Sequence, residues 1–191
     1  MRSRTAMAVV VCTAAFVSLP CLAGAQEDRY LLLATQRTGT MQEEINEAAA
    51  KGFRVVAASR TEGTEVIVLL ERTDDKYQYR LIATTRTGTL QREIGDAADA
   101  GYRVVPRAVT TKRTGGGLAA LGGANNRNEG ELLVLMEKGP EGPANAQYQV
   151  LATTRTGTLQ KEIGQAAING YTLVALTSRG EHVAIMEKAA R

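Results

Sequence analysis

The sequence contains no tryptophan and one histidine, His182, and its two cysteines both lie within the first 21 residues. A single histidine cannot provide the pair of imidazoles that many metal sites use. The sequence also offers no nucleophile paired with a base. We therefore predict no catalytic residues, no metal site and no cofactor, and we expect that the protein is not an enzyme.

The first 25 residues predict a cleaved export signal. Two arginines precede an apolar run over residues 6–17, and Ala23-Gly24-Ala25 supplies the small residues that a signal peptidase requires. A transmembrane anchor is the rival interpretation, but it needs about 20 unbroken apolar residues. We expect cleavage between Ala25 and Gln26, a periplasmic or secreted protein, and no stable membrane span afterwards.

Removal of this signal changes what the composition implies. Loss of Arg2 and Arg4 lowers the formal net charge from +3 to +1. Polyanions are bound by a clear excess of basic residues, so we expect no nucleic-acid partner. Cys12 and Cys21 are lost as well, which excludes disulfides and cysteine metal ligands from the exported chain. Its stability must therefore come from packing.

One nine-residue stretch occurs three times in the chain. ATTRTGTLQ stands at residues 83–91 and again at 152–160, and ATQRTGTMQ stands at 34–42. Each copy lies in the same succession of patterns: a short apolar segment opened by tyrosine, an amphipathic helix, a β-branched run and a longer apolar run. The sequence therefore predicts three tandem βαββ repeats of the α+β class.

The expected bounds follow from these patterns. Repeat 1 covers residues 26–75, repeat 2 covers 76–138, and repeat 3 covers 148–191, after a glycine- and proline-rich linker at 139–147. Repeat 2 carries a glycine-rich insert at 107–130, which we expect to be a loop. A glycine follows each helix pattern at the position where a left-handed residue ends a helix. These glycines are Gly52, Gly101 and Gly170.

Burial considerations predict how the strands and repeats are arranged. The last strand of each repeat is apolar at nearly every position, which favours a central place and the order 1-3-2 in a mainly antiparallel three-stranded sheet. Each repeat is close to the size below which chains seldom fold alone. We therefore expect the repeats to pack through their helix-free faces, with Val66, Val68 and Leu70 among the residues there. One face stays open for a second chain, or the three close around a pseudo-threefold axis.

The repeated Arg-Thr-Gly-Thr motif stands at the start of each helix. Its second threonine, Thr40, Thr89 or Thr158, is placed to accept from backbone N–H groups as the helix cap. In repeat 1, Glu43 would complete a capping box. The same helix start, with an arginine alongside, is also able to hold a phosphate, sulfate or carboxylate. The candidate ligand-binding residues are Arg37, Thr38, Gly39, Thr40, Arg86, Thr87, Gly88, Thr89, Arg155, Thr156, Gly157 and Thr158.

Several segments resemble a small bacterial βαββ domain family of unknown function. These are Tyr79-Arg80-Leu81, the helix opening at residues 90–94, the Gly101-Tyr102-Arg103-Val104-Val105 step and the strand at 133–138. The family signature is a tyrosine-led strand and a G-[WY]-x-[LV]-V step after the helix. The resemblance implies the βαββ fold and brings no activity or site residues with it.

The sequence analysis leaves two candidate functions. The first is an exported, non-enzymatic module of a bacterial envelope that binds a protein partner, associates with itself or supports assembly. The alternative is a binder of a small anion or carboxylate at the three helix starts. Neither the partner nor the ligand is identified by the sequence.

Overall fold

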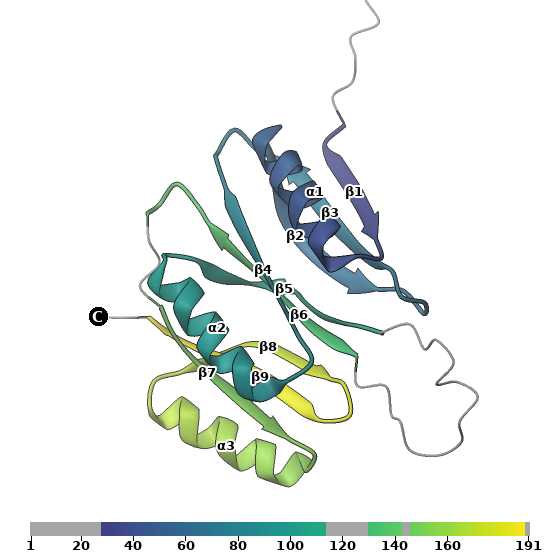
Figure 1. The fold of residues 1–191 in the computed structure, drawn as a ribbon. Helices are drawn as coiled ribbons and strands as arrows, with labels where there is room; N and C mark the ends of the chain where they lie inside the picture. Colours follow the sequence, from purple (N-terminus) through teal and green to yellow (C-terminus); the bar gives the residue numbers. More distant parts are fainter. Residues whose placement is uncertain (1–27, 114–129, 143–145, 190–191) are drawn as a thin grey trace, which may run out of the picture.

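The computed structural model describes residues 28–113, 130–142 and 146–189. These residues form three βαββ units in succession, which confirms the α+β class and the repeats (Figure 1). The expected export signal, residues 114–129 of the expected insert and residues 143–145 of the expected linker lie outside the described residues.

Each unit contains one helix and three strands. Unit 1 comprises β1 (Tyr30–Thr35), α1 (Thr38–Ala50), β2 (Phe53–Arg60) and β3 (Val66–Arg72). Unit 2 comprises β4 (Gln78–Thr84), α2 (Thr87–Asp99), β5 (Arg103–Lys112) and β6 (Glu131–Lys138). Unit 3 comprises β7 (Ala146–Thr153), α3 (Thr156–Ile168), β8 (Thr172–Ser178) and β9 (His182–Ala189).

The sheets have the predicted strand order. In every unit the last strand lies between the other two and pairs antiparallel with both, giving β1-β3-β2, β4-β6-β5 and β7-β9-β8. The helix ends are also as predicted, because Gly52, Gly101 and Gly170 all have φ near +85°: 84°, 88° and 87°. Only glycine adopts this left-handed conformation readily, so it turns the chain from the helix into the second strand.

The β5 strand is longer than the sequence pattern indicated. Residues 107–112 were expected in the loop, but β5 continues to Lys112. Its pairing with β6 is interrupted between Val104 and Val109 and then resumes as far as Lys112 opposite Glu131. Pro106 has no N–H to donate and lies within this bulge, where an unpaired residue is tolerated. The apolar pattern of the sequence breaks at this bulge, and the prediction therefore ended the strand there.

The units stack head to tail, which corrects the expected packing of helix-free faces on one another. Met41 and Ile45 of α1 share one buried cluster with Val66 and Val68 of their own sheet. The same cluster contains residues from the helix-free face of the sheet in unit 2, including Leu133 and Leu135. Val66, Val68 and Leu70 therefore lie on the helix-covered face. The helix is too narrow to cover a whole sheet face, and the next sheet covers the rest.

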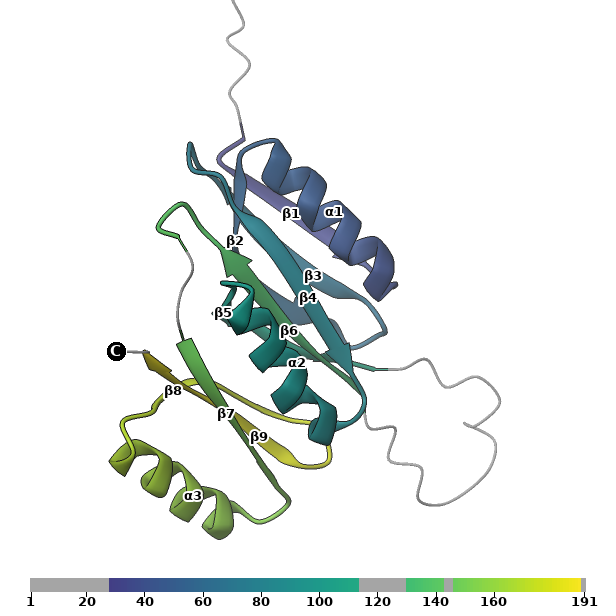
Figure 2. The same cartoon turned by 60° about the vertical axis from the view of Figure 1, so that its left-hand side comes forward.

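The same arrangement recurs between units 2 and 3. Leu90 and Ile94 of α2 pack with Val134 of their own sheet and with Val183 and Ile185 from the helix-free face of unit 3. The strands β2, β5 and β8 contact one another in turn along the row. Figures 1 and 2 show an open row, with unit 1 and unit 3 at opposite ends, rather than a closed threefold ring. Within the described residues no helix has the length and apolar character to cross a membrane.

Leu135 and Leu69 test this stacking, because they occupy equivalent positions opposite Leu81 and Leu32. Leu135 is 2% exposed in the cluster between units 1 and 2, whereas Leu69 is half-buried on the outer face of unit 1. We predict that Leu135→Ala lowers the free energy of unfolding by about 2–5 kcal/mol. The matched Leu69→Ala should cost clearly less. Urea denaturation of both variants measures this, and equal losses would contradict the stacking.

Candidate functional site

The helices begin three residues earlier than predicted. Thr38, Thr87 and Thr156 are the first helical residues, and the cap positions belong to Arg37, Arg86 and Arg155, which make no side-chain cap hydrogen bond. The prediction that Thr40, Thr89 and Thr158 are the caps, and Glu43 part of a capping box, is therefore wrong.

The threonine that ends the preceding strand organises this turn instead. Its Oγ1 accepts from the arginine N–H two residues later: Thr35 from Arg37 at 3.3 Å, Thr84 from Arg86 at 3.1 Å and Thr153 from Arg155 at 3.2 Å. Such turns compete with a side-chain cap for the same backbone segment. Thr89 Oγ1 then donates back to the Arg86 carbonyl at 2.9 Å, so it does not cap the helix.

The first two helix starts each hold a carboxylate from the next unit. Thr38 Oγ1 donates to Glu131 Oε2 at 2.8 Å, and Lys112 Nζ donates to Thr38 Oγ1 at 3.3 Å and lies 3.9 Å from Glu131 Oε2. Thr87 donates to Glu181 in the same way, and Arg179 Nη2 donates to Thr87 Oγ1 at 3.3 Å. A helix start favours negative charge. Here that charge comes from the protein itself.

A tyrosine and a glutamate from the following unit form a second contact. Tyr79 Oη accepts from the Val55 N–H at 2.8 Å and donates to Glu137 at 3.4 Å, while Arg54 Nη2 donates to Glu137 at 2.6 Å. Between units 2 and 3, Tyr148, Glu187 and Arg103 make the same set of contacts around the Val104 N–H. These contacts satisfy buried backbone and side-chain groups that would otherwise destabilise the packed interface.

Burial and hydrogen bonding shift the pKa values of this cluster. Removal from water disfavours the charged phenolate, so burial raises the pKa of both Tyr79 and Tyr148 well above its ordinary value. The backbone N–H donated to each hydroxyl opposes this shift only in part. Hydrogen bonds to the glutamates raise the pKa of Arg54 and Arg103. The tyrosines therefore stay neutral and the arginines charged over the physiological range.

A helix glutamine covers the outer edge of the next sheet. Gln42 Nε2 donates to the Tyr79 carbonyl at 3.1 Å, and its Oε1 accepts from the Leu81 N–H at 2.6 Å. Gln91 bridges the Tyr148 carbonyl and the Val150 N–H, at 2.8 and 2.7 Å. β4 and β7 are edge strands, whose outward backbone groups would otherwise be free to pair with another chain.

We call this repeated contact the junction. Its helix-side half comes from the preceding unit and consists of the first helical threonine, the helix glutamine and the buried valine of the second strand: Thr38, Gln42 and Val55, or Thr87, Gln91 and Val104. Its sheet-side half comes from the following unit and consists of the strand tyrosine, the residue two positions later and two glutamates: Tyr79, Leu81, Glu131 and Glu137, or Tyr148, Val150, Glu181 and Glu187.

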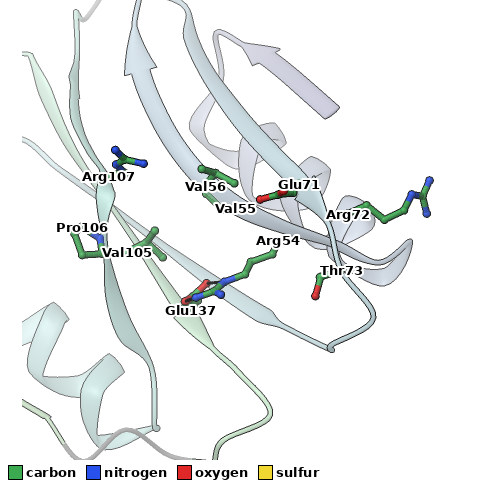
Figure 3. Close-up of a pocket in the computed structure, with 10 residues that line it drawn as sticks. All are labelled: Arg54, Val55, Val56, Glu71, Arg72, Thr73, Val105, Pro106, Arg107 and Glu137. Carbon is green, nitrogen blue, oxygen red and sulfur yellow. Dashed lines mark hydrogen bonds and ion pairs between the residues drawn. The ribbon is translucent and has the colours of Figure 1, made fainter. Parts of the chain in front are cut away.

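A groove of about 590 Å³ lies beside the first junction, between β2 and β5. Figure 3 shows Arg54 reaching toward Glu137, with Val105 and Pro106 opposite Val55 and Val56. The second carboxylate of the groove, Glu71, accepts from Arg29 at 2.7 Å. Both carboxylates of the groove are therefore paired with arginines.

Each end of the row carries an unused half of the junction. Unit 3 has the helix-side half, with Thr156, Gln160 and Leu173 at the positions of Thr38, Gln42 and Val55, and unit 1 has the sheet-side half, with Tyr30, Leu32, Glu65 and Glu71. Leu173 is 49% exposed, whereas Val55 and Val104 are each 3% exposed. Tyr30 is 48% exposed, against 4% and 7% for Tyr79 and Tyr148.

The structure does not bring the candidate ligand-binding residues into one site, because each set lies at the start of its own helix. Three of them are half-buried: Thr38, Thr87 and Thr89. The others are exposed: Arg37, Gly39, Thr40, Arg86, Gly88, Arg155, Thr156, Gly157 and Thr158. The sequence analysis missed the junction glutamines and tyrosines, although both recur at the same place in every repeat. That recurrence was the available signal.

Comparison with known proteins adds no function to this geometry. No family model, curated protein or solved structure matches the chain. The resemblance to the βαββ family therefore stays a prediction. In the described part of the chain, no three His, Asp or Glu side chains gather closely enough to hold a metal ion. The junction and its two unused halves are the features of the structure that bear on function.

Gln91 and Gln160 test the junction directly. Gln91→Ala leaves the Tyr148 carbonyl and the Val150 N–H without their amide partner, which we predict to lower the free energy of unfolding by about 1–3 kcal/mol. Gln160 is the counterpart in unit 3, which no further described unit follows, so Gln160→Ala should stay within about 0.5 kcal/mol of the wild type. Chemical denaturation of both variants provides the measurement. A loss at Gln160 as large as at Gln91 would refute the assignment.

The raised pKa values of Tyr79 and Tyr148 predict a loss of stability at alkaline pH. Above about pH 10 the unfolded chain releases its tyrosine protons while the folded chain retains these two. The stabilisation is therefore complete below pH 10 and declines as the pH rises beyond it. Tyr79→Phe with Tyr148→Phe should flatten this decline in denaturation curves measured between pH 8 and pH 11. Tyr30→Phe, at the exposed counterpart, should retain the wild-type slope.

Proposed function

We propose that this protein is an exported, non-enzymatic binding or assembly module of a bacterial envelope. The N-terminal pattern of two arginines, an apolar run and Ala23-Gly24-Ala25 supports export. Binding of another protein is supported by the two ends of the row, which present surfaces that the interior units bury. The proposed module uses these ends as its contact sites.

One observation carries the proposal: the two halves of the junction bury each other twice within the chain, and each end of the row exposes one half. At the unit 1 end, Tyr30 and Leu32 are exposed and Ile67 and Leu69 are half-buried. At the unit 3 end, the exposed apolar residues are Leu173 and Leu176. Apolar residues gathered on one face, beside unpaired polar groups, are typical of protein contact sites.

The alternative, a binder of small anions at the three helix starts, receives weaker support. Thr38 and Thr87 do bind carboxylates, but these belong to Glu131 and Glu181 of the same chain. An external anion would have to displace a tethered carboxylate that is always present at high effective concentration. The alternative is thereby confined to the third helix start at residues 155–158.

Site-specific photo-crosslinking in the producing cells tests the proposal. We expect a photoreactive residue at Leu32 or Leu176 to form protein adducts, because both side chains are exposed at the ends, at 60% and 59%. Arg92, an exposed residue of α2 in the middle unit, is the matched control position. Adducts at the ends no more frequent than at Arg92 would refute the proposed contact sites. N-terminal sequencing of the exported protein checks the expected start at Gln26.

A further inference from the structure

We propose that the partner of each end is a second copy of this chain. The helix-side half of the junction on unit 3 of one copy would bind the sheet-side half on unit 1 of the next, so that the row of units continues from chain to chain. This inference rests on the proposed function, which assigns protein binding to the two ends. It adds the identity of the partner and the mode of contact.

The apolar surfaces of the two ends correspond to each other position by position. Leu32 and Leu69 occupy the places of Leu81 and Leu135, which the preceding unit covers within the chain. On the other end, Leu173 and Leu176 occupy the places of Val55 and Ala58, which pack in the cluster between units 1 and 2. Joining the ends would therefore bury leucines against leucines, which is favourable because apolar surface leaves water.

The backbone hydrogen bonds of the junction also have both partners available. β1 is an edge strand, and the Tyr30 carbonyl and Leu32 N–H stand where Gln42 bridges Tyr79 and Leu81 in the next unit. Gln160 is the matching glutamine and is exposed at the other end. Its amide would close the edge of β1 in a second copy, as Gln42 and Gln91 close the edges of β4 and β7.

The charged groups of the two ends differ from those of the internal junctions at two positions. Arg54 and Arg103 bind Glu137 and Glu187 across the internal junctions, but unit 3 has Thr172 at their position. The acceptor at the other end, Glu71, already receives two hydrogen bonds from Arg29 of its own chain, at 2.9 and 2.7 Å. An arginine from the second copy is therefore not needed. At the second position unit 1 has Thr61, where the other units have Lys112 and Arg179 beside Glu131 and Glu181. Glu65 would therefore rely on the hydroxyl that Thr156 of the second copy donates.

The geometry of the row requires that such a contact lies between chains. Units 1 and 3 stand at opposite ends, so one copy cannot join its own ends (Figures 1 and 2). A contact between two different surfaces is heterologous, and it produces an open filament or a closed ring of copies. An unrelated protein is the competing occupant. A second copy is favoured because the chain itself displays both halves of a contact that it makes twice internally.

Sedimentation velocity of the purified exported protein over a range of concentrations tests the inference. The wild type should form species larger than the monomer as its concentration rises. Leu32→Asp removes the apolar contact at one end and Leu176→Asp removes it at the other, so each variant alone should remain monomeric. An equimolar mixture of the two variants retains one intact pair of ends. It should form a species of twice the monomer mass and nothing larger.

Two further variants and a control keep this test decisive. Leu32→Thr preserves a residue suited to a strand while shortening the apolar side chain, and Gln160→Ala lies on an exposed helix surface. We expect Gln160→Ala to weaken association about tenfold. Arg92→Asp adds a carboxylate away from both ends and should associate as the wild type does. Circular dichroism and thermal melting verify that each variant is folded.

Two results would overturn the inference. One is a wild type that stays monomeric at its highest soluble concentration, and the other is a mixture that stays monomeric although the wild type associates. Photo-crosslinking separates these from failure of the proposed function. Adducts at Leu32 and Leu176 with a different protein would reject the second copy as partner and preserve the binding role. Control-level adducts together with a monomeric wild type would reject both.

Discussion

Burial of one sheet's helix-free face beneath the preceding unit's helix is the interaction on which this structure depends. A unit such as the one from Tyr30 to Arg72 has about 43 residues, close to the size of about 40 residues below which chains seldom fold without staples. Its single helix covers part of one sheet face only. Stacking covers the remainder, and it explains why β6 is buried on both faces whereas β3 alternates between buried and half-buried residues.

The polar groups of the junction supply hydrogen bonds that apolar burial alone does not provide. Apolar packing alone would leave the Val55 N–H and the edge of β4 without hydrogen-bond partners. Tyr79 and Gln42 satisfy these groups, and each can do so only when the two units lie in one alignment. Such directional contacts select a single packing among the many that apolar faces would permit. The repeated glutamine and tyrosine therefore specify how the units stack.

The same repetition links the fold to the proposed function. A row of head-to-tail units necessarily ends in two different surfaces, and polar residues usually cap the ends of repeat proteins. Here the ends instead retain Leu32, Leu173 and Leu176 as exposed residues. At the helix starts, by contrast, contacts within the chain occupy a candidate binding site. The anion that the Arg-Thr-Gly-Thr motif suggested is present at two of them, as a carboxylate supplied by the next unit.

The sequence by itself determined the local features, because its periodicity, its glycines and its threefold repetition report directly on strands, helices and turns. The βαββ units, the 1-3-2 strand order and the left-handed Gly52, Gly101 and Gly170 follow from such patterns. Only the tertiary structure decided which faces meet, because Val66 and Ile67 are equally apolar and differ only in what covers them. It also decided that Arg37, not Thr40, is the cap of α1, since Thr35 binds the Arg37 N–H and Glu131 binds Thr38 from outside the helix.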